Sequence, residues 1–330
     1  MGFKEARRQR FLSEAHAREL DDDLKHRIDG DRRHIAETEL VKDAVSDYRW
    51  LIATGGLELL ILRYTAGHSI EELRTQLSSV IEDFDDFIGS EISPRLQDPS
   101  RNEADTLEIT QLEAYVYVMW LLSLCKLLGH DALIPKVIGW IDKTHDFNRG
   151  RDILFENLMQ ALTGAHVTTE KVLLHPKPYR PLARATVFEP DQRAALVKEF
   201  LETWYKDMAP CYWHGTHTEK EGSSYFGYWA FEAALVTVLW DIDDSSYRDH
   251  LVYPKDLVDW AREHRTEAVP SGPSRTPGGG PCPQAGWWFT PALKGSRRYF
   301  TQGEVMPNIE GSDYGSTFWQ WDVDQTAPKL

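Results

Sequence analysis

Apolar side chains recur every three to four residues along most of this chain, which is the spacing of one face of an α-helix. The pattern runs through the mixed charges of residues 4–47, while residues 51–64 (LIATGGLELLILRY) are apolar on nearly every side. The first stretch predicts a long solvated helix or a helical hairpin. The second predicts a buried central helix.

The clearest amphipathic stretch covers residues 81–88. At about 100° per residue, its apolar positions share one arc of a helix: Ile81, Phe84, Phe87 and Ile88. The opposite side carries four acids: Glu82, Asp83, Asp85 and Asp86. We expect the apolar arc to face a core and the acids to form an anionic ridge. Ser69 and Glu72 have the spacing of a capping box, which predicts the start of this helix.

Glycine and proline predict where the helices stop. Residues 105–128 have the pattern of a helix that Gly129 ends, and a later helical run ends at Gly164. A loop is expected at residues 93–102, and four prolines predict a long connection between residues 174 and 191. Helices are expected again at residues 192–204, 225–240 and 254–262.

These patterns predict a mainly α protein, either a multi-helix bundle or an α-solenoid-like arrangement, with a small β-rich extension at its C-terminus. We expect an N-terminal helical unit at residues 1–175, a C-terminal helical unit at residues 191–265, and an aromatic-rich tail of strands and turns at residues 281–330. Residues 270–283 (PSGPSRTPGGGPCP) have the composition of a flexible linker. The tail is expected to form a β-meander that packs on the helical body.

Acidic residues outnumber basic ones, and the formal net charge is −15. Residues 71–113 hold twelve acidic and three basic residues, and residues 202–259 hold eleven acidic and four basic residues. A surface of this sign disfavours nucleic acids and anionic membranes, and it favours a basic protein partner. The alternative is a charge that only keeps the protein soluble.

The three cysteines stand far apart, at positions 125, 211 and 282, and the first residues (MGFKEARRQRFLSEA) contain no apolar segment like that of a secretion signal. We therefore expect reduced cysteines and a cytoplasmic protein. The longest apolar run, residues 114–128, contains Lys126 and is shorter than the ~20 residues that span a bilayer. It predicts a buried helix, and no membrane partner is expected.

Four acids have a spacing that resembles a cation-binding loop: Asp241, Asp243, Asp244 and Asp249. A calcium-binding EF-hand requires Gly at its sixth position and Glu at its twelfth, where this chain has Ser246 and Val252. Because Asp and Ser side chains also cap turns and helix starts, a structural role is favoured for these acids.

Cys211, His214 and His217 lie close enough in sequence to supply three ligands of a zinc site. No fourth ligand has the usual paired spacing, and the chain lacks a phosphate-binding glycine loop and a Gly-x-Ser-x-Gly elbow. We expect no metal, no cofactor and no catalytic residue. A metal-dependent hydrolase that uses residues 241–249 with His214 or His217 is the alternative, and a helical-repeat adaptor is a third hypothesis.

One carboxylate stands inside an apolar helical pattern. Glu232 is flanked by Phe231 and Ala233 in a run of apolar residues. Burial of an unpaired carboxylate is costly, so we expect Glu232 to meet an Arg, Lys, Tyr or backbone partner. Its role is then either to define helix packing or to contribute to an interface.

Residues 202–262 carry three segments in a distinctive order: GYWAFEAALV, LWDIDDSSYRDH and YPKDLVDWA. In order and spacing they resemble the C-terminal part of the PoNi-type immunity proteins, which neutralise PoNe-family DNase toxins delivered between competing bacteria. The positions that carry the resemblance are Tyr228, Trp229, Phe231, Glu232, Trp240, Tyr253, Pro254 and Asp256.

This resemblance implies a protein that is not an enzyme and whose partner is a cognate effector toxin with a basic nuclease domain, delivered for example by type VI secretion. A nuclease face must be cationic to hold phosphates. The expected toxin contacts are therefore acids: Glu82, Asp83, Asp85, Asp86, Asp241, Asp243 and Asp244. Whether the protein forms a homodimer is left open.

The tail is similar to that of larger polymorphic-toxin immunity proteins in the segments CPQAGW, RYF, GEVMP and WQWD. Its tryptophans each combine a flat apolar surface with a polar edge: Trp287, Trp288, Trp319 and Trp321. They would form the core of a small β unit, which is the favoured interpretation, or a platform for a carbohydrate or peptide.

Overall fold

The computed structural model of the 330-residue chain describes residues 2–97, 107–142, 148–165, 167, 169, 173–219, 224–264, 275–290, 293, 295–309 and 317–322. The chain divides into two compact units, the first ending at His264 and the second beginning at Arg265. The first unit is helical and the second contains a small sheet. The expected mainly α fold with a small β extension is confirmed.

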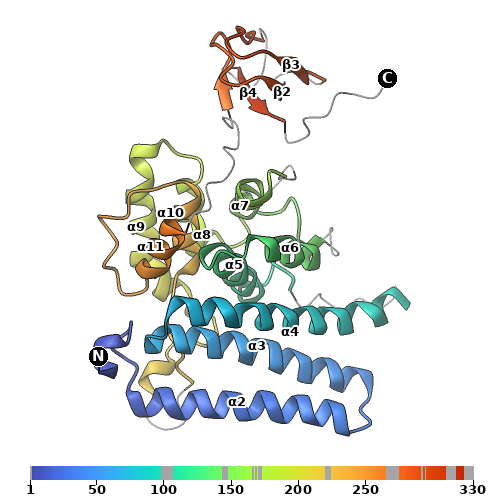
Figure 1. The fold of residues 1–330 in the computed structure, drawn as a ribbon, viewed down its shortest axis with the longest axis vertical. Helices are drawn as coiled ribbons and strands as arrows, with labels where there is room; N and C mark the ends of the chain where they lie inside the picture. Colours follow the sequence, from blue (N-terminus) through green and yellow to red (C-terminus); the bar gives the residue numbers. More distant parts are fainter. Residues whose placement is uncertain are drawn as a thin grey trace. The chain divides into compact units, whose positions relative to one another are not determined.

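Three long helices form one layer of the helical unit (Figure 1). They are α2 (Glu14–Glu37), α3 (Lys42–Ala66) and α4 (Ile70–Gln97). The connections between them are short, which makes neighbouring helices antiparallel. Gly67 adopts a left-handed conformation, with φ of 99°, between α3 and α4. Ser69 and Glu72 then form the predicted capping box.

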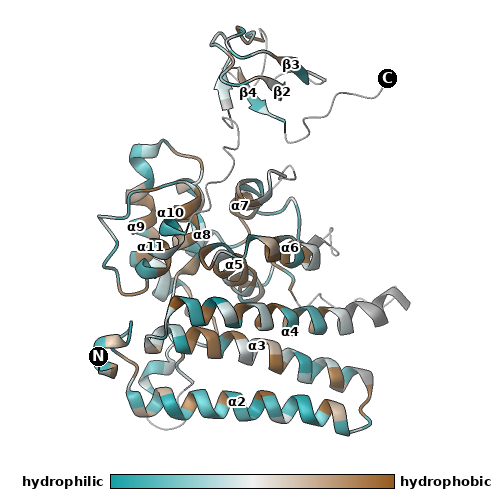
Figure 2. Cartoon of the chain, viewed as in Figure 1, coloured by the Kyte–Doolittle hydropathy of each residue, from teal (hydrophilic) through white to brown (hydrophobic). Residues whose placement is uncertain are grey.

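The core of this unit centres on α5 (Leu112–Leu127), which is buried over most of its length. α10 (Phe231–Leu239) packs along α5 and is equally buried. Figure 2 shows α5 as mostly hydrophobic and α2 as mostly hydrophilic. The predicted buried helix is confirmed, and Gly129 follows it with a positive φ of 66°. The helix begins at Leu112, so the expected start near residue 105 is wrong, although residues 98–106 lie outside the described part.

The remaining helices surround this core. They are α1 (Phe3–Ala6), η1 (Asp131–Leu133), α6 (Ile134–Asp142), α7 (Ile153–Thr163), α8 (Pro176–Ala185), α9 (Pro190–Asp207), η2 (Thr216–Thr218) and α11 (Lys255–Glu263). α8 and α9 pack against each other, and Gly164 ends α7 as predicted. Within the described residues, none of the helices combines the length and the apolar content that a bilayer crossing requires.

The expectations drawn from proline are wrong at two places. Pro176 and Pro190 begin α8 and α9, where a missing N–H costs nothing, so residues 174–191 are not a long connection. The loop expected at residues 93–102 is wrong as far as Gln97, because α4 continues through Pro94 at the loss of one backbone hydrogen bond. Residues 98–102 lie outside the described part. One hydrophobic core extends across both expected helical units, and their division into separate units stays a prediction.

The second unit is a four-stranded antiparallel sheet in the order β1-β4-β2-β3. Its strands are β1 (Arg275–Pro277), β2 (Gly286–Phe289), β3 (Arg298–Phe300) and β4 (Phe318–Trp321). Because β4 lies between β1 and β2, the expected β-meander is wrong. β1 falls within the predicted linker, which is therefore wrong at residues 275–277, and residues 270–274 lie outside the described part.

The tryptophans of the sheet have separate surroundings. Trp288 and Trp319 are buried in a small core with Cys282, Phe300 and Met306, so core packing is confirmed for these two. Trp321 packs against the same core. Trp287 precedes Trp288 in β2 and so lies on the opposite face, where its ring contacts that of Tyr299 at 5.8 Å between centroids.

Candidate functional site

The apolar side of α4 is confirmed. Ile81, Phe84 and Phe87 are buried. Phe84 stacks on Trp140 of α6 with ring centroids 6.1 Å apart, and Trp50 of α3 contacts both phenylalanines. The apolar arc therefore holds α4 between α3 and α6, and the acids occupy the remaining surface of the helix.

Two of the four acids on α4 are engaged by neighbouring helices. Both carboxylate oxygens of Asp83 accept from Arg32 of α2, each at 2.7 Å. Asp85 accepts from Lys136 Nζ at 2.9 Å and from Trp140 Nε1 at 2.7 Å, both on α6. Burial raises the pKa of the Asp83 carboxyl, although the Arg32 guanidinium lowers it. These two acids tie α4 to α2 and α6.

Glu82 and Asp86 are the exposed members of the predicted ridge. They are four residues apart, so they lie on one helix face, one turn from each other. The ridge of four solvated acids that the sequence predicts is therefore reduced to this exposed pair, which we call the acidic pair of α4. A toxin-binding role for any of the four acids stays a prediction.

The acids of residues 241–249 also contribute to the fold. Asp243 accepts from the backbone N–H of Ser245 at 3.0 Å and from its hydroxyl at 2.9 Å, and these bonds lower the pKa of Asp243. Asp249 forms an ion pair with Lys255 at 2.6 Å. The prediction that these acids cap turns is confirmed for Asp243.

Asp244 is the buried acid of this loop, with 5% of its surface exposed. Its Oδ1 accepts from Arg262 at 3.0 Å, and its Oδ2 accepts from Arg248 at 3.2 Å and from the Tyr253 hydroxyl at 3.1 Å. Both oxygens are thus engaged within the protein, where they hold the loop to α11. Asp241, by contrast, is exposed and has a left-handed backbone, with φ of 50°.

The three side chains of the Cys-x-x-His-x-x-His segment differ in their main contacts, although the rings of His214 and His217 both lie near that of Tyr205. Cys211 is buried, and burial raises the pKa of its thiol to about 12. His214 stacks on Tyr205 with ring centroids 4.2 Å apart, whereas His217 Nδ1 lies 2.9 Å from the Tyr228 hydroxyl. In the part of the chain that the structure describes, no three His, Cys, Asp or Glu side chains are grouped so that they could hold a metal ion.

Residues 225–230, expected to be helical, have no regular secondary structure, and the helix begins only at residue 231. Gly227 has a φ of 132°, which favours glycine, and a Cβ there would collide with the hydroxyl of Thr65 on α3. That hydroxyl lies 2.7 Å from the Phe226 carbonyl and accepts from Trp229 Nε1 at 2.9 Å. The close approach of this segment to α3 therefore excludes the predicted helix.

Gln9 connects the N-terminal segment to the same residues, and it is 1% exposed. Its Nε2 donates to the carbonyls of Tyr228 and Leu251. Its Oε1 accepts from the Tyr228 N–H at 2.9 Å and from the Tyr225 hydroxyl at 2.5 Å. One side-chain amide thus uses its whole hydrogen-bonding capacity on segments that lie up to 242 positions away in sequence.

Arg8 and Asp256 form a second link. The Arg8 guanidinium pairs with Asp256 and donates to the Tyr64 carbonyl at 2.6 Å, while the Tyr64 hydroxyl donates to the other Asp256 oxygen. Pro254 is the N-cap of α11, so the helix begins at Lys255, one residue later than predicted. We call residues 225–230 and Asp256, with their partners, the signature junction. The partners are Arg8, Gln9, Tyr64 and Thr65.

Glu232 lies in α10 and is fully buried. Its Oε1 accepts from Trp204 Nε1 at 2.7 Å and from the Tyr179 hydroxyl at 3.3 Å. Tyrosine is one of the four kinds of partner expected for this carboxylate, and tryptophan is not among them. Its Oε2 has no hydrogen-bond partner among the described residues. Burial raises the pKa of Glu232 to about 7, although the two hydrogen bonds lower it. This carboxyl group joins α10 to α8 and α9.

The other residues of the resemblance are also inside the protein. Phe231, Tyr253 and Pro254 are buried, and Trp240 is partly buried against the same core. The sequence analysis missed Arg8, Gln9 and Thr65, because no local pattern marks a residue whose partner is 161 or more positions away.

Comparison with known proteins covers both halves of the helical unit. Residues 18–140 match the family model for the N-terminal part of PoNe immunity proteins (PoNi), and residues 150–257 match the model for their C-terminal part. None of the curated proteins matches the chain. Among solved structures, protein PA2201 from Pseudomonas aeruginosa is similar with a TM-score of 0.59 and 21% identity, over 78% of this chain and 91% of that chain. At that identity, the similarity concerns the fold.

Proposed function

This chain belongs to the family of PoNe immunity proteins, and from that premise we propose that it binds a cognate antibacterial toxin and neutralises it by covering a basic face. An immunity function follows from the family. The DNase activity of the toxin and the manner of inhibition are the proposed parts. The observation that carries the proposal is the match of both family models, in order, over residues 18–140 and 150–257.

Charge supports the proposed manner of inhibition. A DNase must present cationic groups to hold phosphates, and acids at the surface of this protein would compete for those groups. The acidic pair of α4 is exposed, as are Asp241 and Asp243 in the second acidic stretch. Opposite charge speeds the encounter, while apolar and aromatic anchors supply much of the affinity. Such inhibition requires no catalytic group. We propose that it takes place in the cytoplasm, where the toxin would reach DNA.

The test is a double charge reversal, Glu82→Lys with Asp86→Lys, in cells that express the toxin encoded beside this gene. We expect the variant to lose protection, and the purified variant to inhibit DNA cleavage less than the parent does. Because both residues are exposed, the melting temperature should stay close to that of the parent.

A matched control is available on α2. Glu19 and Asp23 are also exposed acids four residues apart, and their reversal to Lys changes the net charge by the same amount. Protection should survive in this control if the position of the acids matters. Equal protection by the parent and both variants would refute the proposed contact, and equal loss in both variants would reduce it to an effect of net charge.

A further inference from the structure

Residues 2–12, which we call the arm, lead into α2 and lie across the signature junction. The arm consists of α1 and an irregular stretch at residues 7–12. It lies outside both family matches, the first of which begins at residue 18. The role of the arm is therefore a property of this chain that the family match does not describe.

Arg8 is the main polar anchor of the arm. Its backbone N–H donates to the Thr65 carbonyl at 2.8 Å, and its guanidinium donates to the carbonyls of Tyr64 and His68 at 2.6 and 3.0 Å. The guanidinium also pairs with Asp256. A planar group with several N–H donors suits the three acceptors of this guanidinium, so the end of α3 and the start of α11 together select arginine at this position.

Gln9 is equally specific. Its amide forms four hydrogen bonds with residues 225–228 and Leu251. Within the described residues, the hydrogen bonds of the Arg8 and Gln9 side chains run to segments 56 or more positions away, and none runs to α2. These contacts do not depend on the connection between the arm and α2. The same segment of another chain can therefore make them.

The end of the arm adds apolar contacts. The Phe11 ring lies 4.8 Å from the His217 ring, centroid to centroid, and Leu12 is fully buried. Arg10, by contrast, is exposed, and its guanidinium lies over the Phe11 ring of the arm itself, 5.3 Å from the ring centroid. The face beneath the arm thus contacts the pattern Arg-Gln-x-Phe-Leu, in which x is the exposed Arg10.

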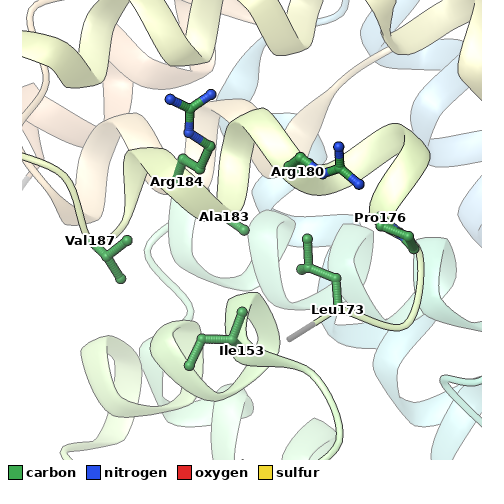
Figure 3. A pocket seen from close by; sticks show the side chains of 7 residues that line it. All are labelled: Ile153, Leu173, Pro176, Arg180, Ala183, Arg184 and Val187. Atoms are coloured by element: carbon green, nitrogen blue, oxygen red, sulfur yellow. The ribbon is translucent and has the colours of Figure 1, made fainter. Parts of the chain in front are cut away.

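The hollow between α7 and α8 does not select a ligand in this way (Figure 3). It has a volume of about 440 Å³ and is lined mainly by apolar side chains, among them Ile153 and Leu173. Figure 3 shows the Arg184 guanidinium turned away from it, and this group lies over the Phe188 ring. An open apolar surface accepts many occupants, whereas a site built from hydrogen bonds rejects those that leave its polar groups unpaired.

We propose that the face beneath the arm is a binding site for the peptide segment Arg8–Leu12, which each chain fills with its own arm and which also accepts the arm of a second copy. The structure shows this segment seated in the site, and a second copy carries the same segment. Two copies that exchange arms would form a dimer. Because the own arm competes at an effective concentration on the order of millimolar, the parent should exchange arms only at high protein concentration. The proposal uses none of the acids that are proposed to meet a toxin.

A labelled peptide with the sequence of residues 2–12 tests the site. The acceptor is the full-length variant Arg8→Gln, whose own arm lacks the ion pair with Asp256. Fluorescence anisotropy should show saturable binding to this variant and at least about tenfold weaker binding to the parent, whose intact arm competes. The Arg8→Gln peptide should bind the variant at least about tenfold more weakly than the native peptide does. The Arg10→Gln peptide is the matched control, and it should bind as the native peptide does because Arg10 is exposed.

Two full-length variants test exchange between copies. The Arg8→Gln chain keeps the site and weakens the arm, whereas the Asp256→Asn chain keeps the arm and weakens the site. In a mixture, the native arm of one chain can pair with the native site of the other. We expect native mass spectrometry, with one chain isotopically labelled, to show a mixed dimer. Each variant alone and the parent should stay largely monomeric at the same concentration.

The site is refuted if the native peptide does not saturate the Arg8→Gln chain at millimolar concentration, or if the native and the Arg8→Gln peptides bind it equally well. Peptide binding without a mixed dimer would refute the exchange between copies. If the Arg8→Gln chain does not fold, the Phe11→Ala chain replaces it as the acceptor, because the Phe11 ring is partly exposed, at 36%. The native peptide should then bind that chain more tightly than the Phe11→Ala peptide does.

Discussion

The signature junction and the acidic pair of α4 differ in what their polar side chains contact. In the junction, Gln9 and Thr65 are buried and bonded to segments far away in sequence. In the acidic pair, Glu82 and Asp86 face solvent. Residues 225–230 and Asp256, which belong to the segments that carry the family resemblance, thus hold the helical unit together, and the acidic pair of α4 lies outside those segments.

The difference has a physical cause. A buried polar group needs a partner of defined geometry, because an unmade hydrogen bond in a low-dielectric interior is costly. A carboxylate in water tolerates many surroundings, and its contribution to stability is small. Substitutions in the junction should therefore lower the free energy of unfolding, whereas substitutions in the acidic pair should alter partner binding.

Gly227→Ala should have the largest effect on stability. The new Cβ would collide with the Thr65 hydroxyl and would require a positive φ of 132° from a non-glycine residue. We expect a loss of about 5 kcal/mol in the free energy of unfolding, or failure to fold. Chemical denaturation measures it. Gly30→Ala in α2 is the control: its Cβ would meet open space, so it should stabilise the helix by about 0.5–1 kcal/mol.

Gln9→Leu should have the second-largest effect on stability. The substitution removes four hydrogen bonds and leaves the Tyr228 N–H and carbonyl, the Leu251 carbonyl and the Tyr225 hydroxyl without the amide that they contact. We expect a loss of about 4 kcal/mol in the free energy of unfolding, because each orphaned buried group costs about 1–3 kcal/mol. Denaturation at neutral pH measures this effect. A loss below 1 kcal/mol in the free energy of unfolding would show that Gln9 does not stabilise the junction.

Glu232→Gln should change how stability depends on pH. The pKa of the buried carboxyl is raised from 4.5 to about 7, so the folded state binds the proton more tightly than the unfolded state does. The stability from protonation is fully present below pH 4.5 and is lost as the pH rises to 7, by about 3 kcal/mol.

Glutamine is neutral throughout this range, so the variant should gain stability relative to the parent between pH 5 and pH 8. Urea denaturation at the two pH values gives the difference. A parallel pH dependence in the two proteins would contradict a raised pKa for Glu232.

The smallest effects should separate the acids of α4 from one another. Asp85→Asn loses the charge that Lys136 and Trp140 share, and we expect a loss of about 1 kcal/mol in the free energy of unfolding. Asp86→Asn should change that free energy by less than about 0.5 kcal/mol. For toxin inhibition the order should be the reverse. If Asp86→Asn destabilises the protein as much as Asp85→Asn does, the distinction between the bound and the exposed acids of α4 is wrong.

Sequence reasoning succeeded where the cause was local. The burial of Phe84, the capping box of Ser69 and the helix end at Gly129 each depend on residues within about one turn of a helix. For Glu232 the sequence predicted that a partner exists, as Arg, Lys, Tyr or backbone, because desolvation demands a hydrogen bond from some donor. Its identity as Tyr179 was not predicted, since nothing near position 232 specifies which helix packs there.

Sequence reasoning failed where a distant segment overrode the local pattern. Residues 225–230 have aromatic residues at helical spacing, but hydrogen bonds to Thr65 and Gln9 hold their backbone in a non-helical conformation. The sheet order likewise could not be foreseen, because a hairpin pattern does not reveal that β4 inserts between β1 and β2. Prolines at residues 176 and 190 indicated a connection, whereas tertiary packing used them as helix starts.

By itself, the sequence determined the mainly α fold, the net charge of −15, the buried carboxylate at position 232 and the resemblance to an immunity family, because periodicity, composition and motif order are properties of neighbouring residues. Only the tertiary structure decided that Asp83, Asp85 and Asp244 are bound within the protein. The same holds for the partners of the signature junction. These features depend on side chains from distant segments, and their energies arise only once the core has removed those segments from water.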